Sequence, residues 1–124
     1  MNDDQTWEFE QRLWTGPASA YEEQVSERVL MALPADPYLY DHRQAIAAVK
    51  DTPRWDSADF VERHLERPAD DLIVLSYRVE AKRAESDYHA LRTSTLLDVD
   101  GTWQVVQNQQ TPLGMEVADP ANAK

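Results

Sequence analysis

"RTSTLLDVDGTWQVVQNQQTP", residues 92–112, has the pattern of two β-strands joined by a tight turn. β-Branched and aromatic residues are common in both halves, and the Asp100-Gly101 pair between them is a strong signal for a two-residue hairpin turn. The second half contains Trp103 and then four consecutive amide side chains at residues 107–110. Because side chains alternate across a strand, these amides must divide between the two faces of the sheet.

The segments before this hairpin extend the predicted sheet toward the N-terminus. "DLIVLSYRVEAKR", residues 71–83, is a further strand, and "RAESD" supplies the turn that follows it. "ERVLMAL", residues 27–33, predicts an earlier strand that ends before Pro34. "WDSADFVERHLER", residues 55–67, fits a helix about as well as a bulged strand, so the local pattern leaves both readings open.

Helices are expected in the first half of the chain. The Asn2-Asp3 pair can cap a first helix, which ends at Gly16-Pro17, and a short second helix is predicted for residues 17–25. The apolar face of the first helix is expected to consist of Trp7, Phe9, Leu13 and Trp14.

A third helix is predicted over residues 42–50, where Asp41 and Gln44 have the spacing of a capping box. Helices followed by a long antiparallel meander indicate an α+β fold. The length of 124 residues suits one domain, which we place at residues 1–113, followed by a flexible C-terminal tail at residues 114–124.

The charge balance disfavours two classes of partner. The formal net charge is -11, whereas binding to nucleic acid or to anionic membranes depends on clustered Lys and Arg. The acidic N-terminus does not resemble a signal peptide, and no apolar run approaches the ~20 residues of a membrane span. The chain has no Cys, which excludes disulfides and thiolate chemistry. A cytoplasmic protein is expected.

The order of these elements resembles a known family. Together with "FEQRLW" (9–14), "LIVLSYRVEA" (72–81) and residues 92–112, it is similar to the nuclear transport factor 2-like superfamily, which includes SnoaL-like polyketide cyclases and ketosteroid isomerase. The chain is most similar to small stand-alone domains of unknown function whose last strand reads Gly-x-Trp, a short apolar run, and His-Gln-x-Thr-Pro. Here Asn108 replaces that His, so any proton transfer by the His is lost.

The resemblance implies a cone-shaped, curved antiparallel sheet, a cystatin-like roll, with the N-terminal helices packed on its concave face. It also implies that residues 55–67 form a strand, which we expect to be bulged. In the family, the face that bears the motif's Trp looks into the cone, which would place Gln107 and Gln109 inside. The full set of ligand-binding candidates is Tyr77, Arg92, Ser94, Gln107 and Gln109 on the inner wall, with Trp14, Tyr38 and Trp55 at the mouth.

Arg92 is the only cation among these inner positions, and a buried unpaired charge is costly. Either a loop carboxylate pairs with it, with Asp36, Asp56 and Asp59 as candidates, or a bound molecule does. We favour the second reading, in which Arg92 anchors a carboxylate or carbonyl oxygen of a small organic ligand.

Catalysis has weaker support in the sequence. Ketosteroid isomerase uses an Asp base; in that enzyme the base precedes a Pro at the end of the first strand, and this chain has Leu33-Pro34 there. His42, His64 and His89 lie far apart in the sequence, so no metal site is predicted, and no motif calls for a cofactor. The sequence favours a small-molecule-binding domain without established catalysis. A lyase, isomerase or cyclase acting on an apolar substrate is the alternative, and a dimeric structural or interaction module is the third reading.

The outer face of the sheet is also expected to be apolar. Alternation places Val74, Leu91, Leu97 and Val106 there, which is more apolar than a solvated sheet face should be. We therefore expect a homodimer that forms through this face.

Overall fold

The computed structural model describes residues 1–114, and the predicted tail lies outside that range except for Gly114. Three helices and six strands form one α+β fold, as the sequence predicts. Their order is α1 (Asp3–Thr15), α2 (Ala18–Gln24), β1 (Val25–Ala32), β2 (Leu39–Tyr40), α3 (His42–Asp51), β3 (Ser57–Ala69), β4 (Leu72–Arg83), β5 (Ser86–Val99) and β6 (Thr102–Pro112). No helix in the described part of the chain is long and apolar enough to cross a membrane.

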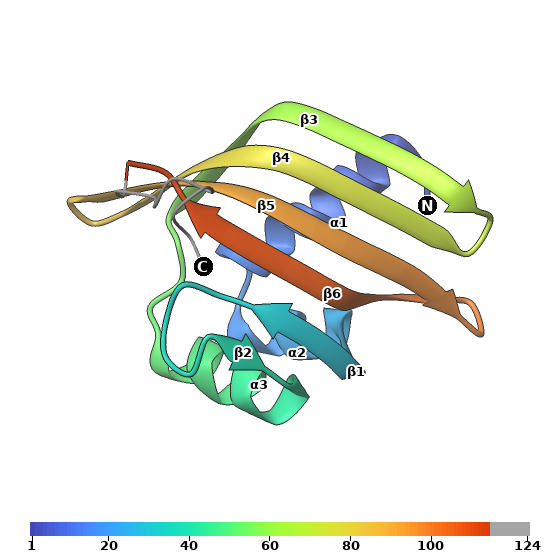
Figure 1. Cartoon of the computed structure of the whole chain (residues 1–124), viewed down its shortest axis with the longest axis horizontal. Helices are drawn as coiled ribbons and strands as arrows, with labels where there is room; N and C mark the ends of the chain where they lie inside the picture. Colours follow the sequence, from blue (N-terminus) through green and yellow to red (C-terminus); the bar gives the residue numbers. More distant parts are fainter. Residues whose placement is uncertain (115–124) are drawn as a thin grey trace, which may run out of the picture.

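All six strands belong to one curved sheet in the order β2-β1-β6-β5-β4-β3. Strands β3 to β6 form an antiparallel meander, whereas β1 returns to pair in parallel with β6. Figure 1 shows α1 lying across one face of the sheet, behind β4 and β5, with α2 and α3 beside β1. The three helices therefore cover one face of the sheet, and no helix within residues 1–114 covers the other.

The helix ends follow the sequence signals. Asn2 accepts a hydrogen bond from the backbone N–H of Gln5, and the Gln5 side chain accepts one from the backbone N–H of Asn2, which completes a capping box at α1. Asp41 and Gln44 form the same arrangement at α3. Asp100 and Gly101 both have positive φ angles, 53° and 87°, which suit a two-residue hairpin turn.

Residues 57–69 form a bulged strand, β3, which resolves the segment that local pattern left open. Its pairing with β4 shifts register between Val61 and His64, and Glu62 at the shift has a positive φ of 52°. An extra residue in one strand increases local twist and bends it. This bend fits the curvature of the sheet around the helices (Figure 1).

A second bulge, in β6, decides which amides enter the cone. Leu96 pairs with Val105, but Thr95 pairs with Gln107, so Val106 is an extra residue in β6. One extra residue reverses which face each later side chain takes. Asn108 is consequently buried, at 1% exposure, whereas Gln109 is exposed.

The prediction that Gln107 and Gln109 point into the cone is therefore wrong. It extended a strict alternation from Trp103 through a strand that is not regular. Gln107 accepts a hydrogen bond from Thr95, which is adjacent to the inward Ser94 and so lies on the outer face. The inner positions expected on β4 and β5 are confirmed, since alternate residues from Ile73 to Ala81 and from Ala90 to Leu96 are buried.

Candidate functional site

A fully buried carboxylate lies at the centre of the molecule. Glu10 is on α1, and its exposure is 0%. The residues of α1 that are buried are Thr6, Glu10, Leu13 and Trp14, which have the three- and four-residue spacing of one helix face. That face rests on the inner side of the sheet, so Glu10 projects toward β4 and β5.

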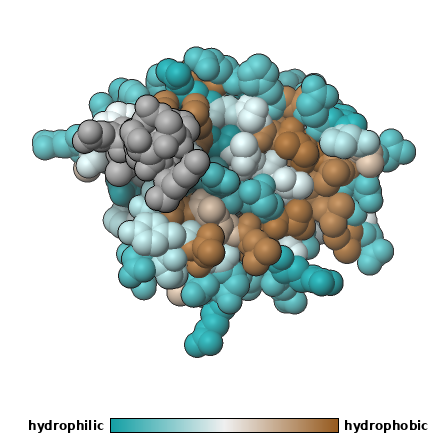
Figure 2. Space-filling view, in the orientation of Figure 1, coloured by the Kyte–Doolittle hydropathy of each residue, from teal (hydrophilic) through white to brown (hydrophobic). Residues whose placement is uncertain are grey.

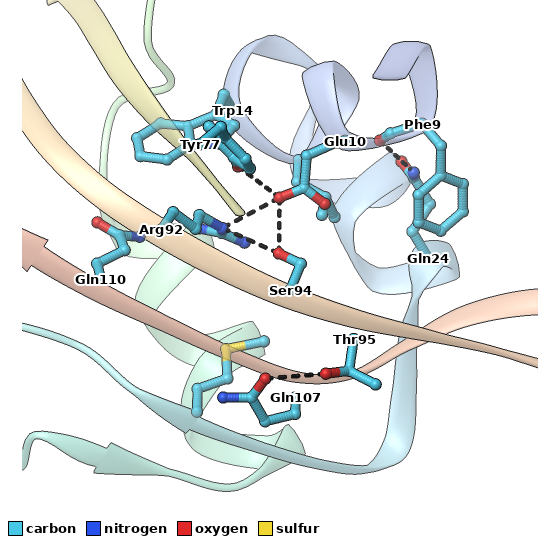
Figure 3. A network of polar contacts seen from close by, with 12 residues as sticks. Phe9, Glu10, Trp14, Gln24, Tyr77, Arg92, Ser94, Thr95, Gln107 and Gln110 are labelled. Atoms are coloured by element: carbon cyan, nitrogen blue, oxygen red, sulfur yellow. Dashed lines mark hydrogen bonds and ion pairs between the residues drawn. The ribbon is translucent and has the colours of Figure 1, made fainter. Parts of the chain in front are cut away.

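Four polar groups converge on Glu10 and its neighbours (Figure 3). Its Oε2 accepts a hydrogen bond from the Tyr77 hydroxyl at 2.5 Å and one from the Ser94 hydroxyl at 2.7 Å. Arg92 Nε lies 3.1 Å from the same oxygen and forms a buried ion pair with it. Trp14 Nε1 in turn donates to the Tyr77 hydroxyl at 2.9 Å. The pair compensates the buried charge of Arg92 inside the protein.

Two atoms of this network are buried without a hydrogen-bonding partner among the described residues: Glu10 Oε1 and Arg92 Nη2. The Arg92 guanidinium also lies over the Trp14 ring, 5.1 Å from its centroid. A guanidinium presents its donors as a fork. Here Nε is used by Glu10, while Nη2 remains free to donate.

Burial and charge make Tyr77 a very weak acid. Burial is the main cause that raises its pKa well above 10, and the adjacent negative charge of Glu10 raises the pKa further. The hydroxyl therefore stays protonated at neutral pH and acts as a hydrogen-bond donor to Glu10.

A cavity of about 400 Å³ adjoins this network, with Trp14 and Arg92 in its wall. Its walls come from α1, α2 and α3, the loop after β1, β2, the segment between α3 and β3, and strands β4, β5 and β6. Most of the lining is aliphatic or aromatic, and Arg92 and Gln110 lie in its wall. The lining includes Trp14, Ala48, Arg54, Trp55, Arg83, Tyr88, Arg92 and Gln110.

The aromatic side chains of the lining contact one another. Trp55 and Tyr88 stack with ring centroids 5.4 Å apart and an interplanar angle of 18°. Trp14 lies 6.3 Å from each of these rings. Tyr88 donates a hydrogen bond to Gln110 Oε1 at 2.9 Å, which leaves the NH₂ group of Gln110 as a donor.

No protein-family model matches the sequence, and a search of the curated proteins finds no relative. Solved structures give the relevant similarity. A nuclear transport factor 2-like protein of unknown function from Prochlorococcus is 14% identical, with 94% of this chain and 97% of that chain covered and a TM-score of 0.75. A proposed ketosteroid isomerase from Parabacteroides distasonis is 16% identical, with 82% and 80% covered and a TM-score of 0.72.

A third solved structure is a proposed calcium/calmodulin-dependent kinase II association domain from Exiguobacterium sibiricum. It is 17% identical, with 90% of this chain and 92% of that chain covered and a TM-score of 0.70. By its similarity to these structures, the present protein has the nuclear transport factor 2-like fold. The expected cone with helices on its concave face is thereby confirmed.

Within this nuclear transport factor 2-like cone, the predicted candidates separate into three groups. Trp14, Trp55 and Arg92 line the cavity. Tyr77 and Ser94 are buried on the inner wall, where both are bound to Glu10. The remaining three candidates lie elsewhere: Gln107 and Gln109 are on the outer face, and Tyr38 is 60% exposed and does not line the cavity.

The loop carboxylates suggested as partners for Arg92 do not pair with it. Asp36 and Asp59 are exposed, and Asp56 accepts a hydrogen bond from the backbone N–H of Ala84. The partner is Glu10, which the sequence analysis missed because it searched strands and loops for acids. The sequence does contain a signal for Glu10. It precedes Leu13 by three residues and Trp14 by four, so it lies on the same face of the helix.

Among residues 1–114, no three His, Cys, Asp or Glu side chains gather closely enough to hold a metal ion. The residues of the cavity wall that sequence reasoning missed include Tyr21, Tyr40, Arg54, Arg83 and Gln110. Gln110 was assigned to the outer face by the same alternation that misplaced Gln107, so a bulge signal in β6 would have corrected both.

We predict that Arg92→Leu lowers the free energy of unfolding by about 3 kcal/mol or more, because it leaves the Glu10 carboxylate buried without its counter-charge. Urea unfolding measures the change. The control is Arg78→Leu, which removes a half-exposed ion pair with Glu62 and should cost less than about 1 kcal/mol. The double variant Glu10→Leu/Arg92→Leu should be more stable than Arg92→Leu alone. If the loss of unfolding free energy in the double variant equals the sum of the losses in the two single variants, the two charges are not coupled.

We also predict that Tyr77 makes the protein less stable in alkali. Because its pKa is raised in the folded state, its contribution is present in full below pH 10 and is lost as the pH rises through the folded pKa. The free energy of unfolding, measured by urea titration between pH 9 and pH 11, should therefore fall less steeply in Tyr77→Phe. Tyr38→Phe, at an exposed position, should keep the slope of the parent protein. Equal slopes in all three proteins would disprove the assignment.

Proposed function

We propose that this protein binds a small, mainly apolar organic molecule in the cavity inside the cone, without catalysing a reaction on it. The observation that carries the proposal is Arg92 Nη2, a buried donor without a partner among residues 1–114, on a residue in the wall of a largely apolar cavity. Mostly hydrophobic walls with a few convergent polar groups are the usual composition of ligand pockets, and about 400 Å³ lies within their usual size range.

The polar groups of the cavity suit hydrogen bonding to a ligand. Arg92 is held by Glu10 at Nε and by the Trp14 ring at its face, so the guanidinium has a fixed orientation before any ligand arrives. Gln110 is oriented by Tyr88 in the same way. Fixed donors lose little conformational entropy on binding, which favours affinity.

The lining supports binding rather than proton transfer. A general base must come within hydrogen-bonding reach of its substrate. Among the described residues, the cavity wall contains no Asp, Glu or His, and Glu10 is fully buried behind Arg92 and Tyr77. For this reason we do not favour the reading as a lyase, isomerase or cyclase.

The test is a thermal-shift screen of small aromatic and alicyclic compounds, both neutral and charged. A ligand at 100 times its Kd stabilises by about 2.7 kcal/mol, on the order of 10 °C for a domain of this size. We expect Ala48→Phe, which fills the cavity from α3, to abolish the shift. Ala47→Phe, one residue earlier on the same helix and exposed, should retain it. Shifts that survive Ala48→Phe would place binding elsewhere.

We further propose that two copies associate through the outer face of the sheet. Figure 2 shows apolar residues gathered over this face, which none of the helices in the described residues covers. Leu30, Leu39 and Leu91 are 68%, 73% and 43% exposed. A groove of about 380 Å³ lies on the same face and includes Leu91, Thr93 and Gln109 in its wall. Exposed apolar surface of this extent supports an interface between copies.

We expect light scattering at micromolar concentration to give twice the mass of one chain. Leu91→Glu places a charge in the proposed interface and should give the monomer mass. Ala47→Glu, an exposed position on α3, should leave the mass unchanged. A monomer mass for the parent protein would overturn the proposed dimer.

A further inference from the structure

The cavity wall has a charge opposite to that of the chain as a whole. The protein contains 23 Asp and Glu residues and 12 Lys and Arg residues. Within the described residues, the cavity wall nevertheless contains three arginines and no carboxylate. These arginines are Arg54, Arg83 and Arg92. Such an excess in an acidic protein marks a local site for negative charge.

Two of these arginines have no carboxylate partner in residues 1–114. Arg54 donates to the backbone carbonyls of Leu13 and Gly16, and its guanidinium lies over the Tyr21 ring. Arg83 donates to the carbonyl of Pro53 and lies over the Trp55 ring, 4.1 Å from its centroid. Neither is within ion-pair distance of an acid in residues 1–114, so both keep their charge toward the cavity.

The arginines also repel one another. Burial is the main cause that lowers the pKa of Arg54, and the positive charges of Arg92 and Arg83 lower it further. All three side chains line the same cavity and so form one positive region, and an anion between them would relieve the repulsion.

The third arginine, Arg92, has an N–H group that is available to a ligand. Arg92 uses Nε for Glu10, while Nη2 is buried and unpartnered in the described part of the chain. Gln110 shares the cavity wall with it, and Figure 3 shows the two side chains beside each other. With Tyr88 donating to its Oε1, Gln110 can offer an N–H to the same ligand oxygen atoms.

We propose that the ligand is a planar aromatic carboxylate, with its carboxylate among Arg92, Gln110 and the two other arginines and its ring system against Trp14, Trp55 and Tyr88. This inference rests on the proposed binding function and adds the ligand's charge class. A carboxylate accepts charge-assisted hydrogen bonds from guanidinium groups, which are about twice as strong as neutral ones. The clustered aromatic rings give the ligand's ring system an apolar surface to contact.

The test compares two probes of nearly the same shape by isothermal titration calorimetry: 2-naphthoate and its neutral amide, 2-naphthamide. We expect the protein to bind 2-naphthoate at least about 10-fold more tightly, which corresponds to 1.4 kcal/mol. Competition between the probes and any hit of the thermal-shift screen establishes that they share the cavity.

A pair of variants tests the role of the arginines. Arg83→Gln removes a charge from the cavity wall, together with one hydrogen bond to the backbone. It should reduce the affinity for 2-naphthoate about 5-fold or more. The affinity for 2-naphthamide should stay unchanged. The control is Arg63→Gln. Arg63 also lies over a tryptophan, Trp7, at 5.0 Å, but it is not part of the cavity wall, so both affinities should stay as in the parent protein.

The outcomes separate this inference from the function on which it rests. Equal affinity for the two probes would overturn the charge class and leave binding of apolar molecules intact. A preference for 2-naphthoate that Arg83→Gln does not reduce would overturn the role of the arginines. If no compound of the screen and neither probe binds, the proposed function itself fails.

Discussion

The structure depends on one buried ion pair, Glu10 with Arg92. Each charge alone would be unfavourable in the core, and each is acceptable because the other is there. The pair joins α1 to β5, and Tyr77 from β4 and Ser94 from β5 donate to the same carboxylate oxygen. It therefore fixes where the first helix sits on the sheet. It also fixes the direction in which the remaining N–H groups of Arg92 point. The same ion pair therefore determines both the packing of α1 on the sheet and the geometry of the candidate site.

The second constraint is the single extra residue in β6. Val106 reverses the faces of all the residues that follow it in the strand, so that Asn108 and Gln110 point inward. Without it, the cone would receive a different pair of amides, and Gln110 would not lie beside Arg92 (Figure 3). The polar character of the cavity wall is thus set by a local irregularity of the backbone as well as by side-chain type.

Much of the fold could be predicted because its signals are local. The capping boxes at Asn2 and Asp41, the Asp100-Gly101 turn and the alternation in β4 and β5 each depend on a few neighbouring residues. The order of the elements then indicated an α+β fold, and the resemblance to a known family implied the cone. The candidate site was predicted only in part, for two physical reasons. A bulge such as that at Val106 has no strong sequence signature, and the pairing of Glu10 with Arg92 joins residues 82 positions apart that meet only in the tertiary structure.

The position of β6 in the sheet has a consequence for how the chain folds. This strand is the last in sequence, yet it lies between β1 and β5 and pairs with both. The contact of Val25 with Val105 closes a loop of most of the described chain, and such non-local pairing slows folding. During synthesis, β1 would have no neighbour in the meander until β6 emerges from the ribosome. β1, with α2 and α3 beside it, would then join the meander only when this strand completes the sheet.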